Sequence, residues 1–395
     1  MKLRKAFRYR LYLTPKQTAF FIRACGCARF IWNKALALQV GRLEADIPLL
    51  RYGDLAKLLT LWRSSEEYGF LAEGPVHTQQ WALKFLDQAI WEGLDRSNPK
   101  KFPKFKKKGY QDSLRYPDSK QIHFDDRVID DEGRHILPQV FLPKVGFVKI
   151  RKSREIEGIV KNVTVSRQGK HWYISVQTEQ EIAAPVCHSQ SAVGIDLGVV
   201  RFATLSTKEI IPAIDTYKLE EKLSKEQRKL SRKKKFSENW KKQKRRVQQV
   251  HTKKASIVKD FHHKISTEIS KNHAIVVMED LKVLNMSASA KGTVEEPGKN
   301  VKAKSGLNKS ILRQGWYSFR LMMQYKLEWS GGSLILVNPR NTSRECPKCH
   351  HIDKDNRKTQ SEFICIRCCY QDDADFVASI NILGAGLAQI ACCFA

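Results

Sequence analysis

The stretch CPKCHHIDKDNRKTQSEFICIRCCYQDDADFVASIN, residues 346–381, combines four cysteines at metal-ligand spacing with acidic residues at the start of an apolar segment. Two residues separate the members of each cysteine pair, so each pair can close a tight turn and present both thiolates to one ion. Two such pairs predict a zinc ribbon with a tetrahedral structural zinc site, whose ligands are Cys346, Cys349, Cys365 and Cys368. Cys369 adjoins the last ligand and could compete with Cys368, although only Cys368 keeps the two-residue gap.

Disulfide bonds are the alternative use of these cysteines, and they need an oxidising compartment. The chain opens with MKLRKAFRYR, which lacks the apolar core of a signal peptide. No run reaches the roughly 20 apolar residues of a membrane span, and the apolar tail, residues 378–395, is interpreted as a packed terminal helix. The cytoplasm, where thiolates stay reduced, is therefore the expected compartment.

The composition favours a polyanionic partner. The 395 residues allow two or three domains, and 42% hydrophobic with 28% charged residues indicate a globular chain. Lys and Arg number 70 against 41 Asp and Glu, which gives a formal net charge of +29. This excess suits a protein that displaces counterions from nucleic-acid phosphates, and it argues against an enzyme for neutral small molecules.

The N-terminal half predicts a β-structure interrupted by helices. Residues 3–13 alternate between apolar and basic side chains, as in a half-buried strand. A capping box at Thr14 then starts a helical region, and short strand patterns return after it. We therefore expect a β-barrel of residues 1–13 and 111–185 with a helical insertion at residues 14–110.

Two basic stretches are candidates for nucleic-acid contact. Residues 99–110 interleave lysines with Phe102, Phe105 and Tyr110, so that cations could hold phosphates while rings stack on bases. Residues 217–272 form a long helical stretch dominated by Lys and Arg, where the density of one sign favours phosphate contact over a merely solvated face. The candidate contacts in these stretches are Lys101, Lys104, Lys106, Arg232, Lys233, Lys234 and Arg245.

A predicted helix that starts at His77 carries amide side chains, which can read base edges but more often only solvate an exposed helix face. Its expected apolar face consists of Trp81, Phe85 and Ile90. Further along, residues 286–309 are small, polar and glycine-containing, and they predict a loop. A core helix should follow it, with one apolar stripe made of Leu312, Trp316, Phe319, Met323 and Leu327.

Three acidic residues lie at element ends in the C-terminal half. Asp196 lies in a buried strand, Glu279 ends a second one, and Asp375 opens the last helix. Each has an innocent explanation, as a turn acid, a strand-end charge or a helix cap with Asp372 and Asp373 as competitors. If the three converge, their repulsion requires divalent cations, and hard oxygen ligands suit Mg²⁺ or Mn²⁺. Two Mg²⁺ ions could then support phosphodiester hydrolysis.

In combination, GIDLGV, VMEDL, CPKC and CIRCCYQDDADFVASINI resemble the TnpB (OrfB) proteins of insertion sequences, whose RuvC-like nuclease is interrupted by a zinc ribbon. The opening KAFRYRLYLTPKQ and the segment CARFIWNKAL are similar to that family's N-terminal part. The resemblance implies an α+β multidomain protein with a wedge-like barrel, a helical recognition insertion and an RNase H-like (RuvC) domain over residues 186–395, its ribbon at residues 341–370. Asp196, Glu279 and Asp375 match the catalytic acids, and the four cysteines match the zinc ligands.

The resemblance further implies an RNA-guided, Mg²⁺-dependent DNA endonuclease of a transposable element in the prokaryotic, nucleoid-associated cytoplasm. Its partners would be a guide RNA from the element and a double-stranded DNA target, without a membrane or a small-molecule substrate. The target would be cut beside a short adjacent motif, for which Tyr52 and Gln80 are the candidate readers.

Two departures from the family pattern bear on activity: Cys369 stands where Gly is usual, and Val377 where Asn is usual. Loss of that amide would remove a partner of a metal ligand and weaken cutting, although Asn381 remains. One alternative function is a cleavage-deficient, RNA-guided DNA-binding protein, a repressor or transposition accessory, which the intact acids disfavour. Another is a transposase acting on DNA directly, for which no His-hydrophobe-His arrangement is evident.

Overall fold

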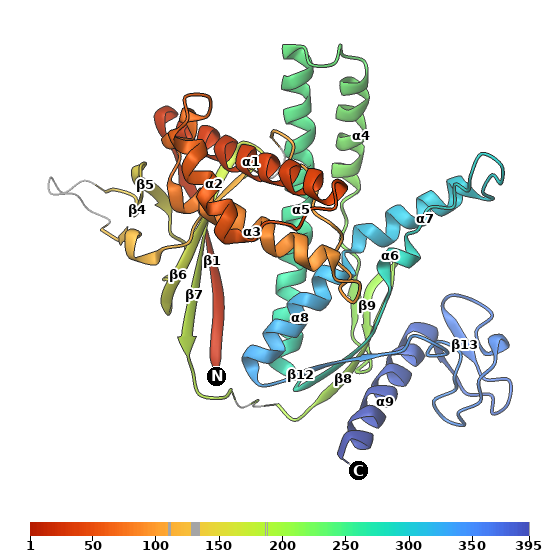
Figure 1. Cartoon of the computed structure of the whole chain (residues 1–395). Helices are drawn as coiled ribbons and strands as arrows, with labels where there is room; N and C mark the ends of the chain where they lie inside the picture. The colour runs from red at the N-terminus through yellow and green to blue at the C-terminus, as the bar shows by residue number, and fades with distance from the viewer. Residues whose placement is uncertain (110–111, 128–134, 186, 188, 395) are drawn as a thin grey trace. The chain divides into compact units, whose positions relative to one another are not determined.

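The computed structural model forms two compact units, Met1–Ile182 and Ala183–Ala395 (Figure 1). The structure describes residues 1–109, 112–127, 135–185, 187 and 189–394. Tyr110 of the basic-aromatic stretch therefore lies outside the described residues. Both units contain helices and sheets, so the mixed α+β class expected from the sequence is confirmed.

The first unit contains a seven-stranded antiparallel sheet in the order β2-β6-β7-β1-β5-β4-β3. The N-terminal strand lies inside this sheet, between β7 and β5, and its buried residues Phe7, Tyr9 and Leu11 belong to the core of the sheet. Within the described residues β2 and β3 are edges, so a closed barrel stays a prediction. The strands are β1 (Lys2–Tyr12), β2 (Ser113–Tyr116), β3 (His123–Asp125), β4 (Gln139–Leu142), β5 (Gly146–Arg151), β6 (Ile159–Gln168) and β7 (His171–Glu181).

Three α-helices lie between β1 and β2 in the sequence: α1 (Pro15–Glu44), α2 (Tyr52–Ser64) and α3 (Val76–Leu94). The predicted capping box is confirmed, since the Thr14 and Gln17 side chains each accept a hydrogen bond from the other's backbone N–H. The first half of α1 packs on the sheet through Phe21, and its second half joins a separate helical core. That core also includes the partly buried Tyr52.

The packed face of α3 differs from the predicted one. Phe85 is 52% exposed, whereas Gln79, Leu83, Leu86 and Ile90 are buried. The Gln79 amide is internally satisfied, because it donates to the Leu71 carbonyl at 2.7 Å and accepts from the Arg63 guanidinium. This amide therefore stabilises the helical core and is not free to read bases, while Gln80 is half-buried.

The second unit is built on a five-stranded sheet in the order β10-β9-β8-β11-β12. Strand β9 pairs antiparallel with both β10 and β8, whereas β8, β11 and β12 run parallel to one another. Parallel neighbours bring their carboxyl ends to one edge of the sheet, where polar side chains can meet. The strands are β8 (Ala192–Leu197), β9 (Arg201–Leu205), β10 (Ile210–Pro212), β11 (Ile275–Glu279) and β12 (Ser333–Val337).

Six α-helices belong to the described part of this unit. The predicted loop at residues 286–309 is partly wrong, because its last third is helical in α7. The expected apolar stripe is also broken: Gly315, with φ of 67°, separates α7 from α8, and Leu312 on α7 is 59% exposed. The helices are α4 (Tyr217–Ser231), α5 (Glu238–Asn272), α6 (Val283–Met286), α7 (Val301–Gln314), α8 (Trp316–Ser330) and α9 (Ala374–Phe394).

Helix α9 packs directly on the sheet. Gly194 in β8 allows this contact, because a Cβ there would collide with the carbonyl oxygen of Ser379 on α9. The segment Ala374–Cys392 is long and apolar enough to cross a membrane by length and composition alone, contrary to our expectation from the sequence. In the first half of this segment, apolar residues such as Val377 and Ile382 are buried inside the protein.

A cluster of ion pairs around the largely buried Glu220 side chain joins α4, α5 and α7. Lys254 contacts the Glu220 carboxylate at 2.6 Å, and Lys309 and Arg313 contact it at 3.4 Å. Burial by itself raises the pKa of Glu220, but the hydrogen bond and charge of Lys254, together with Arg313 and Lys309, outweigh burial and lower the pKa to about 2. The unfolded chain therefore binds more protons between pH 4.5 and pH 2, and the cluster stabilises the fold above this window.

Replacing Glu220 by glutamine should lower the free energy of unfolding by about 2 kcal/mol at pH 7, and this difference should shrink as the pH falls from about 4.5 towards 2. Chemical unfolding of both proteins over this pH range measures the effect. The adjacent, exposed Glu221 offers a matched control, Glu221→Gln, because it makes no ion pair with the described residues. Equal losses at the two positions would contradict the assignment.

Candidate active site and metal centre

The three predicted acids line one cavity of about 490 Å³ in the second unit. Ile195 pairs with Met278 in the parallel β8–β11 ladder, so the next residues along each strand, Asp196 and Glu279, emerge together at the carboxyl edge. Asp375 reaches the same cavity from the first turn of α9. Local sequence thus places each acid at an element end, and the packing of α9 on the sheet brings the third to the first two.

The three acids concentrate negative charge, because the charges of Glu279 and Asp375 both act on Asp196. Burial raises the pKa of Asp196 to about 7, and the charges of Glu279 and Asp375 add to the effect, while Arg357 opposes it. Burial also raises the pKa of Glu279, against a hydrogen bond from Thr342. Carboxylates that repel one another in this way gain most from a shared multivalent cation, and hard oxygen donors suit Mg²⁺ or Mn²⁺. The chemistry of these donors therefore suits a divalent-cation site, although among the described residues only the four cysteines have ligand atoms that all lie within 4.8 Å of one another.

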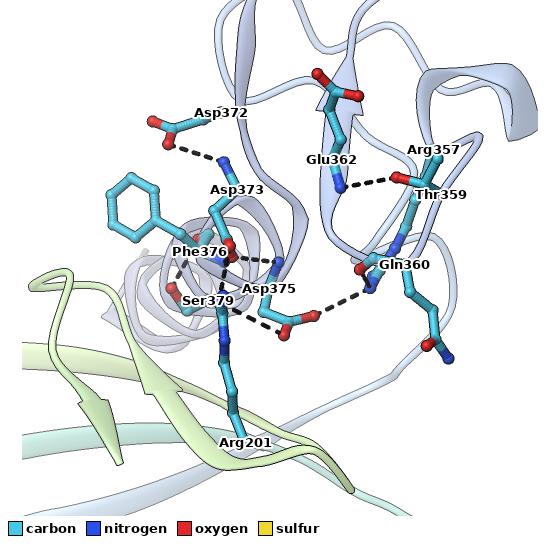
Figure 2. A network of polar contacts seen from close by, with 10 residues as sticks. All are labelled: Arg201, Arg357, Thr359, Gln360, Glu362, Asp372, Asp373, Asp375, Phe376 and Ser379. Carbon is cyan, nitrogen blue, oxygen red and sulfur yellow. Dashed lines mark hydrogen bonds and ion pairs between the residues drawn. The ribbon is translucent and has the colours of Figure 1, made fainter. Parts of the chain in front are cut away.

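Two arginines contact the acid cluster around the start of α9 (Figure 2). Arg357 Nη2 donates to Asp375 Oδ1 at 3.0 Å, and Arg201 Nη1 lies 3.9 Å from Asp375 Oδ2. Arg201 also donates to Asp373 at 2.7 Å. The Asp373 carboxylate accepts the backbone N–H groups of Asp375 and Phe376, each at 3.1 Å. Asp373 therefore caps the helix, which leaves the Asp375 side chain directed to the cavity.

Three residues that contact the acids were missed by the sequence analysis: Arg201, Thr342 and Arg357. The Thr342 hydroxyl donates to Glu279 Oε1 at 2.6 Å. A single threonine or arginine carries no recognisable pattern, and the only available signal was position: Arg201 is the first residue of β9, and Thr342 and Arg357 lie in the ribbon segment. Arg201 contacts an acid 172 positions away, and Thr342 contacts one 63 positions away. Arg357 and Asp375 are 18 positions apart.

The four predicted zinc ligands come together. Their sulfur atoms all lie within 4.8 Å of one another, and the Sγ atoms of Cys346 and Cys368, and of Cys349 and Cys365, are 3.5 Å apart. Zinc–sulfur bonds of about 2.3 Å in a tetrahedron would separate the ligands by about 3.8 Å. The cysteines therefore fit a structural zinc ion. A short hairpin, β13 (Glu362–Ile364) and β14 (Gln371–Asp373), connects this centre to α9.

The two cysteine turns share one backbone feature. The residue after each pair, His350 or Cys369, adopts a left-handed conformation with φ of 55° or 57°, which Gly adopts at lower cost. Cys369 is exposed and does not belong to the four-sulfur group. Val377 is fully buried against the ribbon cysteines and does not line the acid cavity, so an amide is not missing from the cavity wall at this position.

The candidate nucleic-acid contacts lie mostly on exposed surface in their respective units. Lys101 and Lys104 are exposed, and Lys106 Nζ lies 3.5 Å above the Trp32 ring. Phe236, 75% exposed, lies in the turn between α4 and α5. Of the predicted contacts near this turn, Arg232, Lys234 and Arg245 are exposed and Lys233 is half-buried. Their contacts with nucleic acid stay a prediction.

Comparison with known proteins identifies the family. The chain is 44% identical, over 99% of its length and 94% of the other protein, to "Putative RNA-guided DNA endonuclease InsQ" of Escherichia coli (strain K12). The chain belongs to the TnpB (OrfB) family. A second member, "Putative RNA-guided DNA endonuclease" of Streptomyces pristinaespiralis, is 32% identical over 99% of the chain and 91% of its own length. The family resemblance seen in the sequence is thus confirmed.

Family sequence models match three parts of this TnpB chain. They are described as "Probable transposase" at residues 173–290, "Cas12f1-like, TNB domain" at residues 316–382 and "Helix-turn-helix domain" at residues 1–46. The last of these segments contains strand β1 and one long helix, α1. A distantly similar solved structure, a Cas12f1-sgRNA-target DNA complex, has a TM-score of 0.35 at 16% identity and covers 96% of this chain and 99% of its own.

Proposed function

We propose that this TnpB protein is an RNA-guided DNA endonuclease that cuts double-stranded DNA next to a short adjacent motif. One observation carries the proposal: Asp196, Glu279 and Asp375, from two parallel strands and one helix, line a single cavity. The strong basic excess, a net charge of +29, suits a chain that holds both an RNA and a DNA strand. The names of its relatives in Escherichia coli and Streptomyces pristinaespiralis support the same activity.

The second unit is proposed to be an RNase H-like (RuvC) domain, residues 186–395, with the ribbon at residues 341–370. The sheet order β10-β9-β8-β11-β12, in which an antiparallel half joins a parallel half at β8, supports this assignment. The first unit would then provide the wedge-like barrel, residues 1–13 and 111–185, and the recognition helices, residues 14–110. The position of β1 between β5 and β7 supports the joining of the two barrel segments.

The proposed chemistry is phosphodiester hydrolysis with two Mg²⁺ ions, which when bound would activate a water and stabilise the leaving oxygen. The chain itself supplies the three carboxylates that hold the cations. Arg201 and Arg357 contact Asp375 and offset part of its charge. Zinc in the four-cysteine centre has a structural role, since all four ligand positions come from the protein.

The proposed partners are a guide RNA from the element that encodes the protein and a target DNA duplex, in the nucleoid-associated cytoplasm of a prokaryote. Base pairing would select the target, and the protein would hold the backbone of the heteroduplex. The surface lysines and arginines of residues 99–108 and of the α4–α5 turn are suited to backbone contact. Tyr52 and Gln80 remain the proposed readers of the adjacent motif, although both are half-buried in this structure.

The test is to sequence the RNA that copurifies with the protein and to offer the complex plasmids that match the variable end of this RNA. We expect a discrete RNA species, and cleavage only of matching plasmids in the presence of Mg²⁺. Cutting that is independent of the RNA would contradict guided recognition. Guided binding without any cutting would instead favour the alternative function, a repressor or transposition accessory that has lost cleavage.

A further inference from the structure

The ribbon segment between β12 and α9 contacts the acid cavity through the hydroxyl of Thr342. This hydroxyl lies 2.6 Å from Glu279 Oε1 and 3.2 Å from the carbonyl oxygen of Pro339. The hydroxyl has one proton, and the Glu279 carboxylate, which is closer and charged, is a stronger acceptor for it than the Pro339 carbonyl. Thr342 is 7% exposed, so water does not readily replace it. The orientation of the Glu279 carboxylate therefore depends on the position of the Thr342 backbone.

Helix α9 fixes that backbone. Asn381 Nδ2 donates to the carbonyl oxygens of Thr342 and Glu345, each at 2.8 Å. Asn381 thus does not contact an acid itself, but it holds the turn that presents Thr342 to Glu279. Glu345 is in turn bridged to Ile352 across the first cysteine turn. The support for Glu279 is therefore continuous with the ribbon.

The interior of the ribbon is too small to hold this arrangement by apolar packing alone. Its buried cluster consists of Cys346, Cys365 and Phe363 together with Ala374 and Val377 from α9. The buried Asn356 amide ties the two cysteine turns together, because it donates to the Arg344 and His351 carbonyls and accepts from the Ile366 N–H. Small domains of this kind depend on their metal for folding.

We propose that Thr342 is a positioning residue for Glu279 and that the metal-loaded ribbon holds it in place, so that occupancy of the four-cysteine centre increases the affinity of the acid site for divalent cations. The inference rests on the proposed function, since it assumes that the acids bind such cations. The four-cysteine centre then has a second role besides bracing the fold. It links the folding of the ribbon to the cation affinity of the acid site.

The experiment measures Mn²⁺ binding to the full chain by electron paramagnetic resonance of the Mn²⁺ left free in solution, with the Asp196→Asn variant defining binding elsewhere. Thr342→Val keeps the side-chain shape without the hydroxyl, and Thr342→Ser keeps the hydroxyl. We expect Thr342→Val to weaken the Asp196-dependent Mn²⁺ affinity by about tenfold or more and Thr342→Ser to restore it to within about threefold of wild type. Unchanged affinity in Thr342→Val, even with a lower unfolding temperature, would overturn the positioning role.

Ribbon coupling is tested with Cys349→Ser, which removes one thiolate ligand, against Cys392→Ser, which changes an exposed cysteine outside the four-sulfur group. Only the first should weaken Mn²⁺ binding. If Cys349→Ser does not fold, zinc is released from wild-type protein by an organomercurial, and Mn²⁺ binding is measured before and after in the same sample. If the Mn²⁺ affinity is the same with and without metal in the four-cysteine centre, the coupling is overturned. Wild-type protein without Asp196-dependent Mn²⁺ binding would overturn this inference and the proposed metal site together.

Discussion

Replacement of Asp196 by asparagine should reduce guided DNA cleavage by about 10³-fold or more, because cation stabilisation of the transition state supplies several kcal/mol. Asparagine keeps the shape of the side chain and removes its charge, which is repelled by Glu279 and Asp375. The variant should therefore be at least as thermally stable as wild type in metal-free buffer. Binding of RNA and DNA should persist, since the basic surfaces are unchanged. Cleavage time courses, gel-shift assays and thermal unfolding measure the three outcomes.

Asp372 offers the matched control, because it belongs to the same acidic run but does not line the cavity. Its carboxylate lies 3.6 Å from Lys208 Nζ and accepts a hydrogen bond from the Tyr370 hydroxyl. Asp372→Asn should cut at nearly the wild-type rate. If Asp196→Asn cuts as fast as Asp372→Asn, the cavity is not the site of hydrolysis, whatever activity the protein retains.

Replacement of Gly194 by alanine should lower the free energy of unfolding by about 3 kcal/mol, the upper range for an overpacked interior. The added Cβ would collide with the Ser379 carbonyl and would lie 2.8 Å from the backbone nitrogen of Leu383. Both of these atoms belong to the backbone of α9, so the whole helix has to shift. Because α9 carries Asp375, cleavage should fall as well. Denaturant unfolding monitored by circular dichroism gives the stability change.

A second glycine separates this effect from a general sensitivity of the helix. At Gly384 in α9 a Cβ would meet nothing within 4 Å, and an alanine in a helix interior is favoured over glycine by about 0.5–1 kcal/mol. Gly384→Ala should therefore be neutral or stabilising. Full stability of Gly194→Ala would show that α9 does not press on β8 as closely as the structure indicates.

Several elements were predictable because their causes are local. The capping box at Thr14 and the alternation of residues 3–13 depend on side chains close in sequence, and the structure contains both the helix and the strand. The predicted packed face of α3 was wrong at Phe85, which is exposed. The neighbouring Leu83 and Leu86 are buried instead, because a large apolar side chain need not be the one that packs. The helical last third of residues 286–309 was missed because its polar residues show no apolar period.

The candidate site was only partly predictable, because several of its contacts have no local sequence pattern. The family resemblance indicated Asp375 as the catalytic acid, but Asp372 and Asp373 competed with it as the helix cap. The hydrogen bonds at the helix start show that Asp373 caps α9, and Asp375 lines the cavity. Arg357 and Thr342 became visible only as contacts. Neither residue has a spacing or a flanking motif that distinguishes it from other polar loop residues.

The sequence by itself determined the four-cysteine set, the basic character and the family of this chain, because cysteine spacing, charge and motif order are properties of the linear polymer. Only the tertiary structure decided that Asp196, Glu279 and Asp375 share one cavity. That meeting requires parallel pairing of β8 with β11 and a glycine that admits α9 to the sheet. Such contacts join residues that are distant in sequence, so their geometry follows from packing and not from any local pattern.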